Sequence, residues 1–240
     1  MLTPPVSQAV LSLEIPNLPQ LGDVQVGTNA LLHQAAQAWI AKDLEVASPF
    51  RIVLTWGSSG CGKSLLAQAL ANASGCALLY AGSTLADFEA AHTAMAVVVD
   101  DIDRYPDTLA VAAFDLFNHI RNTPSKRWWA TASVPPAQMT ALRADVSSRM
   151  AWGLVFEMLP LGDIDSLSVM QAQAARLGFE LSADSAQYLL MRLERNLSRL
   201  AAHLASLNHY ALALKKPVNP YLVQQWYAHV YVAQLQNSLL

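Results

Sequence analysis

The sequence predicts an α/β fold in which a parallel five-stranded sheet is flanked by helices and followed by a small, all-helical C-terminal lid. Three observations predict it. A glycine-rich phosphate-binding loop, or P-loop, lies between an apolar run and a helical stretch at residues 57–64. Short apolar runs alternate with helical stretches as far as Pro160, which is typical of a parallel sheet covered on both faces. Only helical patterns follow Pro160, which indicates a separate helical unit.

The composition fits one such α/β domain with a helical appendage. Of the 240 residues, 53% are hydrophobic and only 14% are charged, so a membrane protein has to be considered. The apolar stretch 94–99 ends in two aspartates and is far shorter than the ~20 residues that span a bilayer. The chain does not open with a basic region followed by an apolar segment, so we expect no secretory signal, no membrane partner and a cytoplasmic protein.

Charge and cysteine content disfavour two further classes. The 15 Lys and Arg residues against 18 Asp and Glu give a formal net charge of −3, whereas direct nucleic-acid binding draws its affinity from clustered basic residues. Cys61 and Cys76 lack metal-ligand spacing and are too few for a disulfide framework. A helix N-terminus can lower the pKa of a thiol such as Cys61, but position 61 is a permissive one in the loop, and we interpret Cys61 as a bystander there.

The N-terminal residues 1–28 are expected to form a largely extended arm, because they contain four of the twelve prolines and show no helical periodicity. Asn29 is then typical of an N-cap for a helix that runs to about Lys42. One face of this helix is predicted to carry Leu31, Leu32, Ala35 and Trp39.

The following elements are predicted from their apolar runs and breaks. The five strands are expected at Ile52–Trp56, Ala77–Tyr80, Met95–Val99, Trp128–Ala132 and Leu154–Phe156. A helix is expected after Gly62 and another at 108–121, and the lid helices at 164–177, 183–193, 197–214 and 221 to about 235, separated by Gly178 and by Pro217 with Pro220. The predicted units are therefore an arm at 1–28, a nucleotide-binding core at 29–160 and a lid at 161–240.

The phosphate-binding loop is the strongest functional signal. It follows a predicted strand and opens a helix, as this motif requires. Its glycines let the backbone aim amides at phosphate oxygens, Lys63 reaches the β and γ phosphates, and Ser64 can ligate Mg²⁺. We therefore predict that a nucleotide is held by Gly57, Ser58, Ser59, Gly60, Cys61, Gly62, Lys63, Ser64 and Leu65.

A second signal is the pair of acids that ends the apolar run 97–99. Asp100 would hold Mg²⁺ through its water shell, together with Ser64, and Asp101 would polarise the attacking water. The alternative is that both acids only cap the end of the strand. Two adjacent acids after an apolar run, in a chain that already carries a phosphate loop, favour the catalytic role.

Three segments together resemble the AAA+ domain of the DnaA family of replication initiators. They are Asp-Asp-Ile at 100–102, Thr-Ala-Ser-Val-Pro-Pro at 131–136 and Ser-Arg-Met-Ala-Trp-Gly at 148–153. The resemblance runs from about Val26 to the C-terminus. Within the family the chain is most similar to the Hda group, because we expect only a core, a lid and a short arm, without the interaction domain and DNA-binding helices of an initiator.

This resemblance implies a nucleotide, partners and an activity. The nucleotide would be ADP or ATP with Mg²⁺, in an adenine pocket that involves Val26, Gly27 and Asn29. The partners would be DnaA and the β sliding clamp of DNA polymerase III, with DNA contacted only indirectly through the clamp. Such a protein stimulates ATP hydrolysis by DnaA and so prevents re-initiation, with weak or no ATPase of its own. The sequence is also compatible with a homodimer.

The resemblance also implies roles for residues beyond the two loops. Thr131 and Ser133 would occupy the polar sensor position between the Asp100 region and the γ-phosphate, although a threonine at a strand end is common in any fold. Arg149 would be an arginine finger that reaches the ATP of DnaA. The alternative for Arg149 is an ordinary surface salt bridge.

Three positions depart from the family pattern. The arginine expected in the lid aligns with Ser198, one residue before Arg199 and three after Arg195, and we take Arg199 as the nucleotide contact. One residue on a helix is a rotation of about 100°, so Arg199 reaches the phosphates only with a local change of register. Position 101 is an aspartate, so ATP hydrolysis by the protein itself is not excluded. At position 133 a serine replaces an aspartate of the family.

The arm contains a segment, Gln-Ala-Val-Leu-Ser-Leu at 8–13, that resembles a clamp-binding peptide. In such a peptide the apolar side chains, here Leu11 and Leu13, dock into a pocket while Gln8 fixes the register by hydrogen bonds. A shorter form of the motif would place Val10 where the glutamine belongs. The alternative is a strand that covers the protein's own core.

Two other functions share the phosphate loop. A small-molecule kinase usually inserts an arginine-rich lid between core strands, whereas the helical unit here follows the core. A helicase loader or transposition helper has the same core but usually binds DNA through basic residues, which are few and scattered in this chain. Both alternatives are disfavoured.

Overall fold

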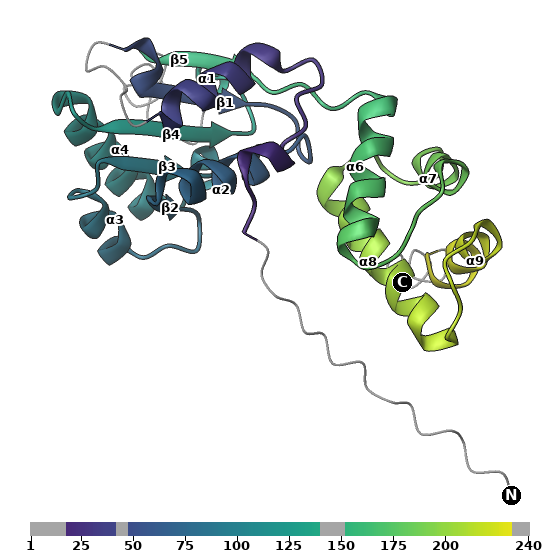
Figure 1. Cartoon of the computed structure of the whole chain (residues 1–240). Coiled ribbons are helices and arrows are strands. Elements are labelled where there is room, and N and C mark those ends of the chain that lie inside the picture. The colour runs from purple at the N-terminus through teal and green to yellow at the C-terminus, as the bar shows by residue number, and fades with distance from the viewer. Residues whose placement is uncertain (1–17, 42–47, 140–151, 232–240) are drawn as a thin grey trace, which may run out of the picture.

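The computed structural model describes residues 18–41, 48–139 and 152–231, which form an α/β core and a helical lid (Figure 1). The core sheet has the strand order β2-β3-β4-β1-β5, and all of its pairings are parallel. Its strands are β1 (Ile52–Trp56), β2 (Ala77–Leu79), β3 (Ala96–Val99), β4 (Arg127–Ala132) and β5 (Leu154–Glu157). The predicted five-stranded parallel sheet is confirmed, and the strand ends differ from the predicted ones by no more than a residue.

The core helices cover both faces of this sheet (Figure 1). They are α1 (Ala30–Ile40), α2 (Lys63–Ser74), α3 (Leu85–Ala91) and α4 (Asp107–Asn122). Short 3-10 turns connect them at η1 (Leu21–Asp23), η2 (Pro49–Arg51), η3 (Ile102–Arg104) and η4 (Pro136–Gln138). The crossovers from β1 to β2, from β2 to β3 and from β3 to β4 therefore bring α2, α3 and α4 back over the sheet.

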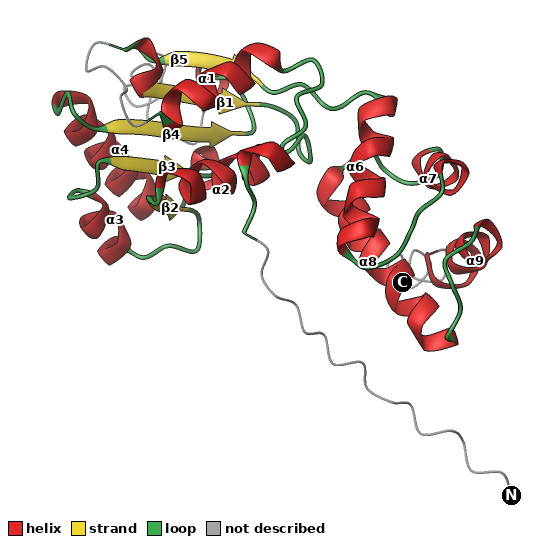
Figure 2. Cartoon of the chain, viewed as in Figure 1, coloured by secondary structure: helices red, strands yellow, loops and turns green. Residues whose placement is uncertain are grey.

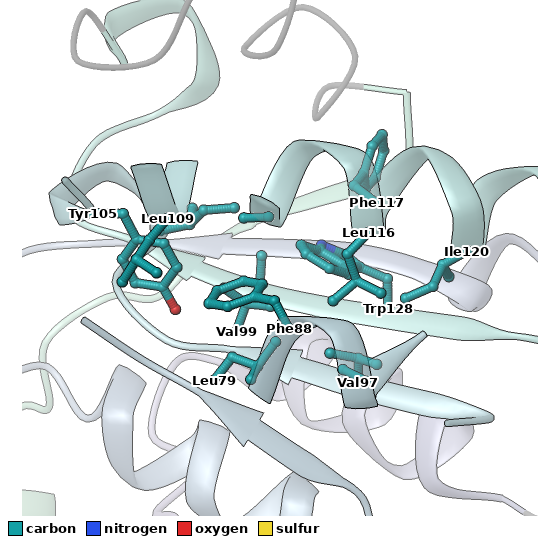
Figure 3. Packing of buried hydrophobic residues seen from close by; sticks show 14 of the residues in the cluster. Leu79, Phe88, Val97, Val99, Tyr105, Leu109, Leu116, Phe117, Ile120 and Trp128 are labelled. Atoms are coloured by element: carbon teal, nitrogen blue, oxygen red, sulfur yellow. The ribbon is translucent and has the colours of Figure 1, made fainter. Parts of the chain in front are cut away.

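Side chains of adjacent strand residues enter two separate cores, because successive residues of a strand point to opposite faces. Trp128 packs under α3 and α4, where its ring centroid lies 5.5 Å from that of Phe117 (Figure 3). Trp129 enters the opposite core under α1 and α2, 5.8 Å from Trp39. Both faces of the sheet are thus buried, which explains the continuous apolar runs in its strands.

The lid contains helices only in the part of the chain that is described (Figure 2). Its helices are α6 (Asp163–Arg176), α7 (Ala183–Leu190), α8 (Leu197–Leu214) and α9 (Pro220–Trp226), and a π-helical turn, Tyr227–Tyr231, follows α9. They share a third core that includes Leu189, Leu204 and Trp226. Helix α7 ends three residues before the predicted end. None of the described helices combines the length and apolarity that a membrane span needs.

Two expectations about the first 40 residues need correction. Leu31 is 72% exposed, because the buried stripe of α1 consists of Leu32, Ala35, Ala36 and Trp39, and residue 31 lies outside that stripe. The segment 18–28 is not simply extended. It contains η1, and the side chain of Val24, 7% exposed, packs into the core under α1 and α2.

Candidate nucleotide-binding site

The loop between β1 and α2 has the geometry of a phosphate cradle. Gly60 and Gly62 adopt φ values of 77° and 109°, a region that residues with a Cβ rarely occupy. Gly62 is the N-cap of α2, so the free amides of the first turn of the helix lie at the loop. A side chain on Gly57 would clash with the carbonyl oxygen of Met158. Gly60 and Gly62 therefore allow the loop its tight backbone turns, whereas Gly57 permits close packing against the segment that follows β5.

Lys63 is the charged centre of this loop. The residue is only 6% exposed, and its Nζ donates to the carbonyl oxygens of Gly57 at 2.8 Å and Ser58 at 2.9 Å. Among the described residues, no carboxylate lies within ion-pair distance of Nζ. A buried ammonium whose nearest partners are two carbonyl oxygens and a thiol, with no carboxylate, is costly to leave unpaired. The residues present thus fit a phosphate group, which would supply the missing negative charge.

Cys61 lies under the same loop with 2% of its surface exposed. Burial raises the pKa of its thiol, and the nearby charge of Lys63 opposes this shift without overcoming it. A raised pKa disfavours the reactive thiolate. The interpretation of Cys61 as a bystander in the loop stays a prediction.

The two acids after β3 are held by Thr131, at the end of β4. The Thr131 hydroxyl donates to Oδ1 of Asp100 at 2.5 Å and accepts from the backbone N–H of Asp101 at 2.8 Å. Asp101 has φ of 50°, an uncommon value for a residue with a side chain. Burial raises the pKa of Asp101, the charge of Asp100 raises it further, and Arg104 opposes both. Thr131 therefore fixes the position of both carboxylate residues.

Ser133 has a different environment from Thr131. Its backbone N–H donates to Oδ1 of Asp103 at 3.0 Å, and its hydroxyl donates to Oδ2 of the same residue. Asp103 belongs to η3, so the contact ties the turn after the two acids to the end of β4. Sequence reasoning missed Asp103, although the acid-rich run Asp-Asp-Ile-Asp at 100–103 was a signal for it.

A cavity of about 620 Å³ lies between the core and the lid. It brings together eight of the predicted nucleotide-site residues: Ser59, Gly60, Gly62, Lys63, Ser64, Leu65, Asp101 and Arg199. Gly57, Ser58 and Cys61 do not line the cavity and instead surround Lys63. Asp100, Thr131 and Ser133 also lie outside its lining and form the hydrogen bonds that hold Asp101 and η3.

Part of the cavity lining consists of residues that sequence reasoning did not select. Gly22, Asp23 and Gln25 line the cavity from the core, and Arg176 lines it from α6 of the lid. Arg176 forms an ion pair with Asp23, so that core and lid are joined at this edge. These two residues are 153 positions apart in the chain, and no local pattern links them.

The predicted adenine-pocket residues Val26, Gly27 and Asn29 follow that segment but do not line the cavity. Asn29 is the N-cap residue of α1, as predicted, yet its side chain makes no cap hydrogen bond. Its amide instead donates to the carbonyl of Leu159 at 3.0 Å and accepts from the N–H of Leu159 at 2.8 Å. The Asn29 side chain thus connects the beginning of α1 to the segment between β5 and α6.

The lid also touches the phosphate loop directly. The N–H of Leu197 donates to the carbonyl oxygen of Gly60 at 3.2 Å, and a side chain on Gly60 would clash with Asn196. Asn196 caps α8 by accepting from the N–H of Arg199 at 3.2 Å. The beginning of α8 is therefore anchored on the loop that would hold phosphate.

Two arginines near this helix differ in position. Arg199 lines the cavity and forms an ion pair of 2.7 Å with Glu194. Arg195 pairs with Asp163 at 2.9 Å and is not part of the lining. Position thus favours Arg199 over Arg195 as a nucleotide contact. Arg149 and the arm residues Gln8, Leu11 and Leu13 lie outside the described residues.

Comparisons with known proteins follow the same division into core and lid. The family model described as Hda, lid domain matches residues 163–226. The lid of this chain is therefore similar to the lid domain of Hda proteins. The core-then-lid order and the sheet described above are those of the AAA+ fold, which agrees with the fold predicted from the sequence.

Solved structures of AAA+ proteins superpose on most of this chain. Domain III of the replication initiation protein DnaA from Thermotoga maritima aligns with a TM-score of 0.71 and 16% identity over 85% of this chain and 93% of that one. AMPPCP-bound DnaA from Aquifex aeolicus aligns with a TM-score of 0.61 and 18% identity over 78% of this chain and 64% of that one. The Thermotoga maritima RuvB Holliday junction branch migration motor gives a TM-score of 0.63 and 15% identity over 83% and 67% of the two chains.

Proposed function

We propose that this Hda-like protein is a DnaA-related regulator of replication initiation that holds ADP or ATP with Mg²⁺ in the cavity between core and lid. The observation that carries the proposal is an Hda-type lid closing over a complete phosphate loop. DnaA structures with the same fold have been solved with AMPPCP, which supports a nucleotide in the corresponding place. The finer proposal is that the protein binds the sliding clamp and stimulates ATP hydrolysis by DnaA.

Each group of residues has one task in this proposal. The loop amides and Lys63 bind the phosphates at the N-terminus of α2, where the helix dipole favours negative charge. Ser64 and Asp100 are the residues that would hold Mg²⁺, which would supply positive charge at the terminal phosphates. The described residues contain no group of three or more His, Cys, Asp or Glu side chains that could hold a metal ion.

The ion pair between Asp23 and Arg176 is expected to slow nucleotide release, because it joins core and lid at the edge of the cavity. Partly exposed ion pairs contribute little energy, so Arg176→Gln should speed dissociation only about threefold. Stopped-flow release of a fluorescent ADP analogue measures this. Arg176→Lys keeps the charge and should stay near the wild-type rate.

Ionic strength separates an electrostatic role for Arg176 from a steric one. Salt screens a partly exposed pair, so raising the salt concentration should speed release from the wild type and change Arg176→Gln much less. Equal salt dependence in both proteins would contradict a role for the pair.

The regulatory proposal is tested by Arg149→Ala in a reconstituted reaction with DnaA, ATP and DNA-loaded clamp. An arginine finger stabilises transition-state charge on the ATP of a neighbouring protein and contributes roughly 10³-fold or more to its hydrolysis. We expect the variant to bind ADP normally and to lose stimulation of DnaA. Arg192→Ala is the matched control, because Arg192 is an exposed lid residue stacked on Tyr188. Full stimulation by Arg149→Ala would remove this residue from the mechanism.

A further inference from the structure

Arg104 is a cation of the cavity that none of the roles above uses. It ends η3, the turn that follows the two acids after β3, and its side chain is 57% exposed. It lines the cavity together with Lys63, Ser64 and Asp101. The same short segment of chain thus places Arg104 and Asp101, the acid predicted to polarise the attacking water, at the same cavity.

The other cations that line the cavity already have close partners. Lys63 donates to two carbonyl oxygens, Arg176 pairs with Asp23, and Arg199 pairs with Glu194 at 2.7 Å. Arg104 has only Asp101, with Nη1 and Oδ2 separated by 3.8 Å, which is too far for a hydrogen bond. The guanidinium of Arg104 thus makes no hydrogen bond to any other described residue, and its donors are available for a ligand.

The position of Arg104 indicates which part of a nucleotide it would meet. The phosphate loop follows β1 and the two acids follow β3, and β4 lies between these strands in the sheet. Gly22, Asp23 and Gln25 also line the cavity, and Asp23 pairs with Arg176 at the C-terminal end of α6. A nucleotide with its base beside these residues and its phosphates at the N-terminus of α2 directs its last phosphate toward Asp101 and Arg104.

Asp101 and Arg104 differ in their freedom to respond to a ligand. The backbone of Asp101 is fixed by its hydrogen bond to Thr131, and the residue is held in a left-handed conformation. The long, exposed side chain of Arg104 carries no such constraint. A planar guanidinium with free donors matches a phosphate group by paired, charge-assisted hydrogen bonds.

We propose that Arg104 binds the terminal phosphate of the nucleotide within its own chain and makes the site prefer ATP over ADP. The inference rests on the proposed nucleotide site and assigns to it a residue that selects between its two ligands. It differs from the role of Arg149, because Arg104 acts on the nucleotide of the same chain.

Calorimetric titration of the full chain with AMPPCP and with ADP, each with Mg²⁺, tests the inference. Arg104→Gln should weaken AMPPCP binding about tenfold, the size expected for a lost charge-assisted hydrogen bond, and should change ADP binding less than about twofold. Arg104→Lys keeps a charge without the fork geometry and should lie between the two. Arg192→Gln removes the same charge from outside the cavity and should leave both affinities unchanged.

The outcomes separate this inference from the proposed function. If the wild type binds neither nucleotide, the proposed site itself fails and the role of Arg104 fails with it. If the wild type binds both and Arg104→Gln leaves the ratio of the two affinities unchanged, whether by weakening both or neither, only the role of Arg104 is overturned. Melting temperatures of all variants show whether a lost affinity reflects a lost fold.

Discussion

Replacing Lys63 by alanine should reduce adenine-nucleotide affinity at least about 100-fold, because its Nζ is the buried cation of the phosphate loop. Without a ligand, Nζ donates to the carbonyl oxygens of Gly57 and Ser58 and contacts Cys61 Sγ, and no carboxylate of the described residues forms an ion pair with it. A phosphate would provide the full countercharge at the same place. Binding is therefore expected to depend on Lys63 more than on any other side chain of the cavity.

The stability of the protein should respond in a different way from its affinity. Lys63→Ala removes a buried charge that has no carboxylate partner and so relieves a desolvation cost. We therefore expect the melting temperature to stay near the wild-type value although the nucleotide affinity falls. Lys63→Met fills more of the space than alanine and should show the same loss of binding. Lys216→Ala, an exposed lid position, is the control for loss of a positive charge. Unaltered ADP affinity in both Lys63 variants would mean that the ligand binds elsewhere.

Deleting residues 1–14 should lower affinity for the sliding clamp at least about 100-fold. A peptide interface usually depends on a few anchors that contribute about 2 kcal/mol or more each, and Gln8, Leu11 and Leu13 are the predicted anchors. The described sheet takes its five strands from residues 52–157. The truncated protein is therefore expected to fold and to bind ADP like the wild type.

Titration of surface-immobilised clamp with three variants makes this test specific. Gln8→Ala combined with Leu11→Ala should lose nearly as much affinity as the truncation. Ser7→Ala combined with Ser12→Ala changes the same arm at positions that are not predicted anchors and should bind normally. Equal binding by all variants would refute the peptide, and unfolding of the truncated protein would favour the alternative of a strand that covers the core.

The sequence was sufficient to predict those parts of the fold that depend on local patterns. The apolar runs ending at Trp56 and Val99 identified the strands, because a strand buried on both faces needs consecutive apolar residues. The phosphate loop was predicted for a similar reason, since its glycines and Lys63 act within one short run of consecutive residues.

The remaining features depend on contacts between distant segments. Asn29 was predicted correctly as an N-cap, but its side chain bonds with Leu159, a partner that no local pattern indicates. The ion pair between Asp23 of the core and Arg176 of the lid, both in the cavity lining, likewise joins segments that are far apart in the sequence. The exposure of Leu31 has a similar origin, because the packing of α1 against the core buries Leu32 and leaves its neighbour Leu31 exposed.

The central claim is that one adenine nucleotide lies between the core and the lid. Photolabelling with an 8-azidoadenosine diphosphate, followed by peptide mass spectrometry, tests it most directly because the azide reacts next to the base. The account predicts labelled peptides from residues 18–28 and from α6, labelling that excess ADP prevents, and no labelling of Lys63→Met. Labelling that ADP does not prevent, or that falls only on segments outside the cavity, would contradict the account.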